Sequence, residues 1–320
     1  MQIIIAMPVY EDWESAFELC RQIDVVFARE PVSRISIILI DDGSSATSCP
    51  SAMPFLPGTL AEISVVHMRR NLGHQRAIAV GLTYIHQHRQ ADAIVVMDSD
   101  GEDKPEEIPK LLAAMKGHQR PTAVFAARGR RFEHISFRLF YFAYRVAHRF
   151  LAGRNIRFGN FSVLPWPHLE SLVVFPELWN HYAATLVKSR LPYAEIRSDR
   201  GVRFAGRSRM NFVDLVVHGL SALFANQEVV GTRLLMMNVI LAGGLFFAIA
   251  AVIGVKLLTN LGIPGWATST IGLLLILLCQ SFVASVVLVF ATMMNRSELG
   301  FLPIRDYCYF IKGETRVYSE

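Results

Sequence analysis

The stretch AIVVMDSDGED, residues 93–103, decides how this chain folds. Residues 93–97 are an apolar, β-rich run of the kind found in a strand buried on both faces. Four acidic side chains follow within six residues: Asp98, Asp100, Glu102 and Asp103. A buried strand that ends in clustered carboxylates is the first sign of a site at the edge of a sheet.

Similar runs lie on both sides of this stretch. Further strands are predicted at residues 2–6, 35–40, 62–67 and 123–127, and helices at 13–28, 74–88 and 106–115. Strand and helix alternating at this spacing predict a mostly parallel sheet with helices on both faces. Ligands of such sheets bind beyond the carboxyl ends of the strands.

The acid cluster has two interpretations. Packed negative charge is unfavourable unless a cation neutralises it, and hard carboxylate oxygens favour Mg²⁺ or Mn²⁺, which leave open positions for phosphates. The alternative is a solvated turn that caps a helix beginning near Pro105, with Asp103 as the N-cap.

Two other strand ends carry weaker signals. IDDGSS, residues 40–45, places two carboxylates where they can accept hydrogen bonds from a base and a ribose. MPVYED, residues 7–12, offers exposed backbone and an aromatic ring that can frame a nucleobase. Each motif is common in turns and says little by itself.

Two late apolar runs, 234–255 and 267–294, are each long enough to cross a bilayer, and the chain is 52% apolar. Buried core helices are the alternative, but neither run has the polar stripe of a soluble helix. The loop between the runs holds one charge, whereas four basic residues follow the second: Arg296, Arg305, Lys312 and Arg316. The positive-inside rule therefore predicts that both flanks are cytoplasmic.

Composition narrows the classes of site and partner that this chain can have. The four cysteines show no C-x-x-C spacing and the histidines no H-E-x-x-H motif, so neither a zinc site nor a disulfide framework is indicated. The net charge of +5 next to two spans favours anionic lipid over nucleic acid. Residues 132–150 mix aromatic and basic side chains, which fits an interfacial helix or a core helix with a charged face.

Four motifs together resemble the family-two glycosyltransferases of GT-A fold: AMPVYE at 6–11, IDDGSS at 40–45, RRNLGHQRA at 69–77 and VVMDSDGED at 95–103. GNFSVLP at 159–165, RFAGRSRMN at 203–211 and the paired spans make the chain similar to polyprenyl-phosphate glycosyltransferases within that family. That group includes dolichol-phosphate mannosyltransferase and bactoprenol glucosyltransferase.

The resemblance implies roles for individual residues. The nucleobase pocket would be lined by Pro8, Tyr10 and Glu11, with Asp41 or Asp42 on the nucleoside. Metal ligands would be Asp98, Asp100 and Glu102, the last often Gln in the family. Arginines for the phosphates would be Arg128, Arg203 and Arg209, with Arg138 a looser match. Where many relatives carry G-D-F-R-L, this chain has Asn160 and Ser162 in place of the acid and the base, which leaves the acceptor side open.

The implied activity is inverting, metal-dependent transfer of one sugar from a UDP- or GDP-linked donor to a polyprenyl phosphate. The protein would lie in the bilayer of a bacterial inner membrane. It would form a homo-oligomer, for example a tetramer, and would have no nucleic acid partner. The alternatives are transfer to a lipid or glycan hydroxyl, which needs a positioned base, and a non-catalytic nucleotide-binding scaffold.

The predicted organisation has six parts. They are a nucleotide-sugar-binding domain at 1–165, an acceptor-side and interfacial segment at 166–232, a first span at 233–256, an outer loop at 257–266, a second span at 267–294 and a cytoplasmic tail at 295–320.

Overall fold

The computed structural model describes residues 1–29, 34–45, 54–128, 158–199, 201, 203–204, 227–258, 265–297 and 300–319. The chain divides into two compact units. The first comprises Met1–Arg138, Ile156–Ala225 and Phe301–Glu320, and the second comprises Leu139–Asn155 and Asn226–Gly300.

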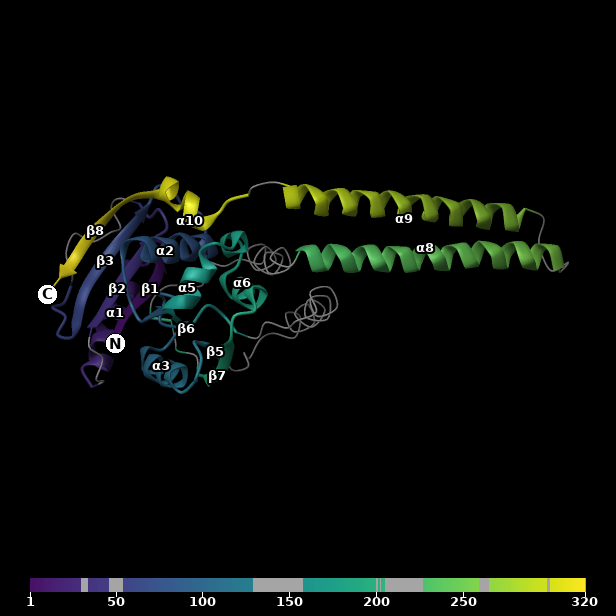
Figure 1. Ribbon diagram of the computed structural model, residues 1–320. Helices are drawn as coiled ribbons and strands as arrows, with labels where there is room; N and C mark the ends of the chain where they lie inside the picture. The colour runs from purple at the N-terminus through teal and green to yellow at the C-terminus, as the bar shows by residue number, and fades with distance from the viewer. Residues whose placement is uncertain are drawn as a thin grey trace. The chain divides into compact units, whose positions relative to one another are not determined.

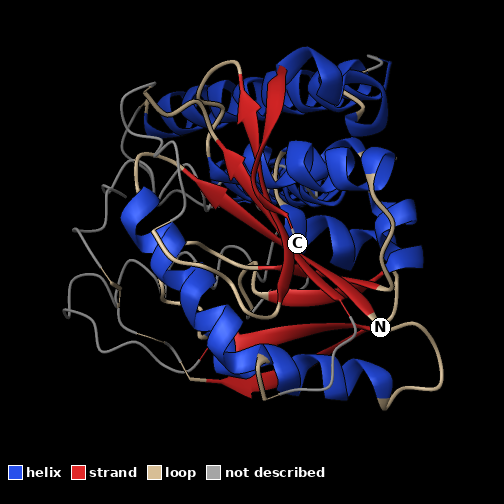
Figure 2. Ribbon diagram, turned by 90° about the vertical axis from the view of Figure 1, so that its left-hand side faces the viewer, coloured by secondary structure: helices blue, strands red, loops and turns tan. Residues whose placement is uncertain are grey.

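A single twisted sheet forms the centre of the first unit (Figures 1 and 2). Its strands are β1 (Gln2–Val9), β2 (Arg34–Asp41), β3 (Leu60–Met68), β4 (Ala93–Val96), β5 (Ala123–Arg128), β6 (Ser162–Pro165), β7 (Tyr193–Ser198) and β8 (Ile311–Ser319). Their order is β7-β5-β6-β4-β1-β2-β3-β8. The four central strands β4, β1, β2 and β3 are parallel, whereas β6 and β8 run antiparallel to their neighbours. The predicted mixed, mostly parallel sheet is confirmed.

Helices cover both faces of this sheet, as Figure 2 shows. They are α1 (Trp13–Phe27), α2 (His74–His88), η1 (Pro105–Glu107), α3 (Ile108–Lys116), α5 (Trp166–Leu172), η2 (Pro176–Trp179) and α6 (Tyr182–Ser189). Successive strand residues point to opposite faces, so β1 sends Ile4 to the core with α2 and Ile5 to the core with α1. Both faces are buried, which explains the unbroken apolar runs of the central strands.

The strand register brings the predicted motifs together at one edge. In β1 and β2, Val9 pairs with Asp41, and in β2 and β3, Asp41 pairs with His67. Strand β4 runs parallel to β1, with Ala6 beside Val96. The loops that follow β1, β2 and β4 therefore meet at the carboxyl edge of the sheet.

The C-terminal residues supply an edge strand that the sequence analysis described only as a tail. After α10 (Pro303–Asp306) and η3 (Tyr307–Phe310), β8 pairs antiparallel with β3. Figure 1 shows β8 in yellow alongside β3. Tyr84 of α2 donates its hydroxyl to Glu314 Oε2 at 2.8 Å, so this strand also contacts the helical layer.

The second unit consists, in its described part, of α8 (Gln227–Leu258) and α9 (Trp266–Ser297). Val229–Leu258 and Trp266–Ala291 are long and apolar enough to cross a membrane, and most of their side chains are exposed in the isolated chain. A polar contact joins the two helices: Asn238 Nδ2 donates to Ser281 O at 2.8 Å and to Ser285 Oγ at 2.9 Å. Such interhelical hydrogen bonds are typical of packed membrane helices.

Candidate active site

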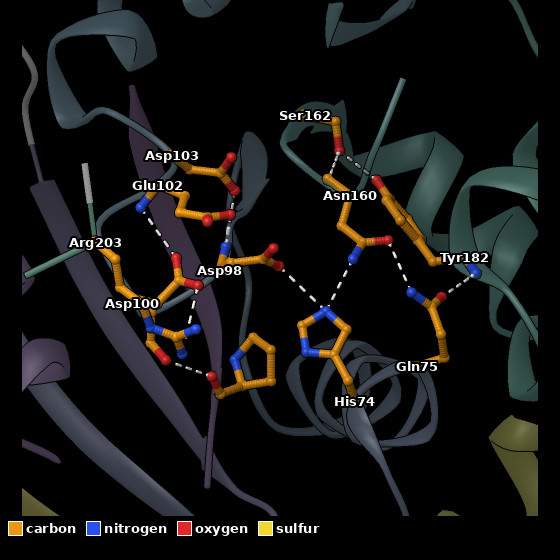
Figure 3. A network of polar contacts seen from close by, with 12 residues as sticks. His74, Gln75, Asp98, Asp100, Glu102, Asp103, Asn160, Ser162, Tyr182 and Arg203 are labelled. Carbon is orange, nitrogen blue, oxygen red and sulfur yellow. Dashed lines mark hydrogen bonds and ion pairs between the residues drawn. The ribbon is translucent and has the colours of Figure 1, made fainter. Parts of the chain in front are cut away.

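The acid cluster forms a closed loop after β4 (Figure 3). The backbone N–H of Asp98 donates to Asp103 Oδ2 at 3.0 Å, and the N–H of Glu102 donates to Asp100 Oδ1 at 3.0 Å. Asp103 is buried, and Lys104 rather than Asp103 occupies the N-cap position of η1. Asp103 therefore holds the loop closed.

A second segment contributes Gly201, Arg203 and Phe204 against this loop. Gly201 N–H donates to Glu102 O at 2.8 Å, and Phe204 N–H donates to Asp100 O at 3.1 Å. Gly101 has φ +86°, and a Cβ there would lie 2.5 Å from the Phe204 ring, so only glycine fits this crossing.

This crossing brings Arg203 to the acids. Its Nη2 atom lies 3.5 Å from Asp12 Oδ2 and 3.7 Å from Asp100 Oδ2. The structure thus places an arginine predicted to bind phosphate beside a carboxylate predicted to bind metal, although more than 100 residues separate them in sequence.

Of the other predicted arginines, the structure describes only the backbone of Arg128. Arg128 is the last residue of β5, which runs antiparallel to β6, itself antiparallel to β4. Strand β5 therefore points the same way as β4, and Arg128 ends at the edge that carries the acid loop. The Arg128 side chain, Arg138 and Arg209 lie outside the described parts of the structure.

The loops after β1 and β2 are tied to each other and to the acid loop. Ser99 Oγ donates to Pro8 O at 2.7 Å. Glu11 has φ +55°, its N–H donates to Ser44 Oγ at 2.9 Å, and its Oε1 accepts from Ser45 N at 2.6 Å. This left-handed backbone is a strained conformation that these contacts maintain. Tyr10, the residue before Glu11, is 44% exposed.

The two carboxylates that end β2 have different surroundings. Asp42 accepts from Leu72 N at 2.7 Å and from Gly73 N at 2.9 Å, so it anchors the start of α2, and burial raises its pKa. Asp41 accepts from Ser44 N at 2.9 Å and contacts His67 Nδ1 at 2.9 Å. Burial acts to raise the pKa of Asp41, but the bonds from His67 and Ser44 outweigh it and the pKa is lowered. Of the two candidates, Asp41 is thus the better suited to a nucleoside.

Figure 3 also shows a polar network that the sequence analysis missed. His74 Nε2 lies 3.1 Å from Asp98 Oδ1 and 2.8 Å from Asn160 Nδ2. Gln75 continues the network, donating Nε2 to Asn160 Oδ1 at 3.0 Å and accepting from Tyr182 N at 2.9 Å. Burial acts to lower the pKa of His74, but Asp98 and the neighbouring carboxylates outweigh it and the pKa is raised.

This network accounts for the departure from the family pattern at 159–163. Asn160 bonds to His74 and Gln75, while Ser162 Oγ lies 2.7 Å from Tyr182 OH. In the sequence, only the G-H-Q triplet at 73–75 pointed to this network. No sequence pattern pairs that triplet with Asn160, so the contact could not be predicted. Two other polar residues close to this region in sequence have structural contacts: Glu177 bonds to Lys188 Nζ at 2.5 Å, and His181 is the N-cap of α6.

Fold and site together define a glycosyltransferase of GT-A fold. The chain belongs to glycosyl transferase family 2, whose family model matches residues 4–164.

Two curated relatives share the name undecaprenyl-phosphate 4-deoxy-4-formamido-L-arabinose transferase. The protein from Salmonella choleraesuis (strain SC-B67) is 34% identical over 113 residues, which cover 35% of this chain and 33% of that one. The protein from Klebsiella pneumoniae subsp. pneumoniae is 32% identical over 112 residues, with 35% and 33% covered. The match thus spans about a third of the length of these relatives.

Among solved structures, the chain is similar to glucosyl-3-phosphoglycerate synthase from Mycobacterium tuberculosis, solved with Mn²⁺, uridine diphosphate and phosphoglyceric acid. The TM-score is 0.51 at 15% identity, with 72% of this chain and 78% of that chain covered. This likeness confirms the GT-A fold.

Proposed function

We propose that this protein transfers one sugar from a UDP- or GDP-linked donor to a polyprenyl phosphate, with inversion at the anomeric carbon and with Mg²⁺ or Mn²⁺ as cofactor. The observation that carries the proposal is the meeting of Asp98, Asp100 and Arg203 at the carboxyl edge of the sheet. The curated relatives, which are named for transfer to undecaprenyl phosphate, support the choice of acceptor.

The donor set fits a hard divalent cation. Within the described residues, no group of three or more His, Cys, Asp or Glu side chains is arranged to hold a metal by itself. Mg²⁺ in nucleotide enzymes is commonly bound by one or two carboxylates together with substrate phosphates and water. Asp98 and Asp100 are the residues that would hold it, with Glu102 as a further candidate, and the bound ion would stabilise the charge of the leaving nucleoside diphosphate.

The charge of the acceptor explains why arginines matter here. A phosphate monoester has a second pKa of about 6 and is largely a dianion at pH 7. It can therefore attack the anomeric carbon without a general base. Its approach to the donor diphosphate brings two anions together. Arg203, with Arg128 and Arg209 as further candidates, would offset that repulsion.

The connectivity supports one orientation in the membrane. The residues before α8 belong to the first unit, and those after α9 return to it as β8. Two spans whose flanks fold into one unit cross the bilayer as a hairpin, with that unit on a single face. The basic residues after α9 favour the cytoplasmic face of a bacterial inner membrane.

A homo-oligomer remains a prediction that light scattering of the purified protein would test.

Transfer to a hydroxyl is the competing function. A hydroxyl needs a general base, and the amide of Asn160 cannot act as one. Among the described residues, His74, which is 43% exposed and in contact with Asp98, is a candidate for that base.

The decisive experiment uses the full chain in detergent with Mn²⁺ or Mg²⁺ and a panel of UDP- and GDP-sugars. Undecaprenyl phosphate and undecaprenol serve as matched acceptors, and products are identified by mass spectrometry. We expect a glycosylated undecaprenyl phosphate that disappears with EDTA. Transfer to undecaprenol alone would refute the proposal that the acceptor is a phosphate. Undiminished transfer in EDTA would refute the proposal that a metal is required.

A further inference from the structure

Strand β8 reaches the nucleoside end of the site through two side chains. Thr315 Oγ1 lies 3.1 Å from His67 Nε2, and His67 Nδ1 lies 2.9 Å from Asp41 Oδ2. Side chains from three neighbouring strands thus form a continuous series of hydrogen bonds from the sheet edge to Asp41.

The register of the sheet brings these three side chains together. Asp41 of β2 is paired with His67 of β3, so the two side chains are direct neighbours. Strand β8 pairs Thr315 with Val65, two residues before His67. Alternate residues share a face, so Thr315 lies diagonally across from His67, within reach of an imidazole ring.

The hydrogen-bonding chemistry fixes the hydrogen on Nδ1. The Asp41 carboxylate only accepts, so Nδ1 carries a hydrogen and donates it. The Thr315 hydroxyl can donate or accept, so it bonds to Nε2 whether or not that atom carries a hydrogen. The orientation of the His67 ring therefore depends on Thr315 as well as on Asp41.

Asp41 is held from its other side as well. Its Oδ1 accepts from Ser44 N at 2.9 Å, and the residue is only 5% exposed. The plane of the carboxylate is therefore set by the β2 loop on one oxygen and by His67 on the other. A change in the His67 ring would be transmitted directly to Oδ2.

The opposite face of β8 is anchored separately. Glu314 accepts from Tyr84, and Arg316 Nε lies 3.3 Å from Glu62 Oε1. These contacts hold the strand in register without touching His67. They provide a control that separates docking of β8 from the contact at Thr315.

We propose that Thr315 and His67 are positioning residues for Asp41, so that the strand following the two candidate spans sets the affinity of the site for the nucleoside part of the donor. This inference rests on the proposed function and on assigning to Asp41, rather than Asp42, the nucleoside contact that the family resemblance implies. It makes the C-terminal strand part of the donor site.

The test measures binding of UDP and of GDP to the detergent-solubilised full chain with Mn²⁺, by calorimetry. Thr315→Val, which keeps the shape and removes the hydroxyl, should weaken binding of the preferred nucleotide about 3- to 10-fold, the effect of one hydrogen bond. Thr315→Ser, which keeps the hydroxyl, should restore most of the affinity. His67→Ala should weaken binding at least as much as Thr315→Val, and the KM for the sugar donor should rise in both while kcat changes little.

Arg316→Gln is the matched control, because it removes an ion pair from the other face of β8. Its nucleotide affinity should equal that of the unmodified protein. Equal weakening by Arg316→Gln and Thr315→Val would show general loosening of β8 and overturn the proposal, as would unchanged binding in Thr315→Val. If the unmodified, folded protein binds neither UDP nor GDP, the proposed function itself fails, which is a distinct result.

Discussion

The Nε2 atom of His74 lies 3.1 Å from Oδ1 of Asp98, which joins the first turn of α2 to the acid loop after β4. The side-chain amides of Asn160 and Gln75 connect this ring to the start of α6. Tyr182 N–H can only donate, so Gln75 must present Oε1 to it and Nε2 to Asn160. Asn160 Nδ2 then lies 2.8 Å from the same Nε2 atom of His74. Contacts among these side chains thus connect the acid loop to a backbone N–H of α6.

The first prediction concerns that network. Gln75→Met keeps the length of the side chain but leaves the buried Tyr182 N–H without its acceptor, at a cost of about 1–3 kcal/mol. The midpoint of thermal unfolding should fall by roughly 2–10 °C. Gln87→Met, at an exposed position of the same helix, is the control and should leave the midpoint unchanged. Equal midpoints for the two variants would show that the network contributes nothing to stability.

The second prediction concerns Asp100, the acid that we propose binds the metal. Asp100→Asn keeps an oxygen to accept from Glu102 N but loses the charge that a divalent cation needs. Transfer should fall about 100-fold or more, the loss typical of removing one electrostatic stabiliser from an active site. Steady-state rates and thermal midpoints are measured together, with Glu195→Gln, an exposed carboxylate on β7, as control. Full activity in Asp100→Asn would remove this residue from the metal site.

The third prediction separates two effects of Arg203. Its guanidinium lies 3.7 Å from Asp100, so it would compete with a cation for that carboxylate. Arg203→Met should strengthen binding of Mn²⁺ alone by about 3- to 10-fold, since a neighbouring charge at this distance contributes on the order of 1 kcal/mol. The same variant should slow transfer, because the charge that offsets the phosphates is lost.

Calorimetry with Mn²⁺ and a transfer assay check the two directions for Arg203. Arg203→Lys keeps the charge and should leave metal affinity close to that of the unmodified protein. If Arg203→Met weakens both metal binding and transfer, the competition between the guanidinium and the cation does not exist.

The fourth prediction concerns acid stability. Asp24 of α1 accepts from the backbone N–H groups of Gly58, Thr59 and Leu60 at 2.9, 2.8 and 3.2 Å. Burial acts to raise its pKa, but these bonds and the Thr59 hydroxyl outweigh it and lower the pKa. A carboxyl whose pKa is lower in the folded than in the unfolded protein stabilises the fold above about pH 4, the ordinary pKa of Asp. That contribution is lost as the pH falls through the folded pKa.

Thermal midpoints of the unmodified protein and of Asp24→Asn, taken from pH 7 to pH 3, test this account. The variant should be less stable at pH 7 by about 1–3 kcal/mol, and the difference should shrink below about pH 4. A difference that stays constant across this range would show that the carboxylate charge of Asp24 does not matter.

The sequence by itself determined strands β1 to β5, the helices α1, α2 and α3 that pack on them, and the paired apolar helices. Each depends on a local pattern: unbroken apolar runs for strands buried on both faces, and long runs without a polar stripe for α8 and α9. The placement of Asp98 and Asp100 at a carboxyl edge followed from the same patterns, since an acid after a parallel strand has only one edge to occupy.

Tertiary structure alone decided which distant residues meet. The strand pattern of β8 carries few apolar side chains, and its partner β3 lies more than 240 residues earlier in sequence. The contacts of His74 with Asn160, of Arg203 with Asp100 and of Thr315 with His67 likewise depend on strand order and register. Local periodicity encodes which face of an element is buried, but the pairing of one element with another is set by the packing of the whole sheet.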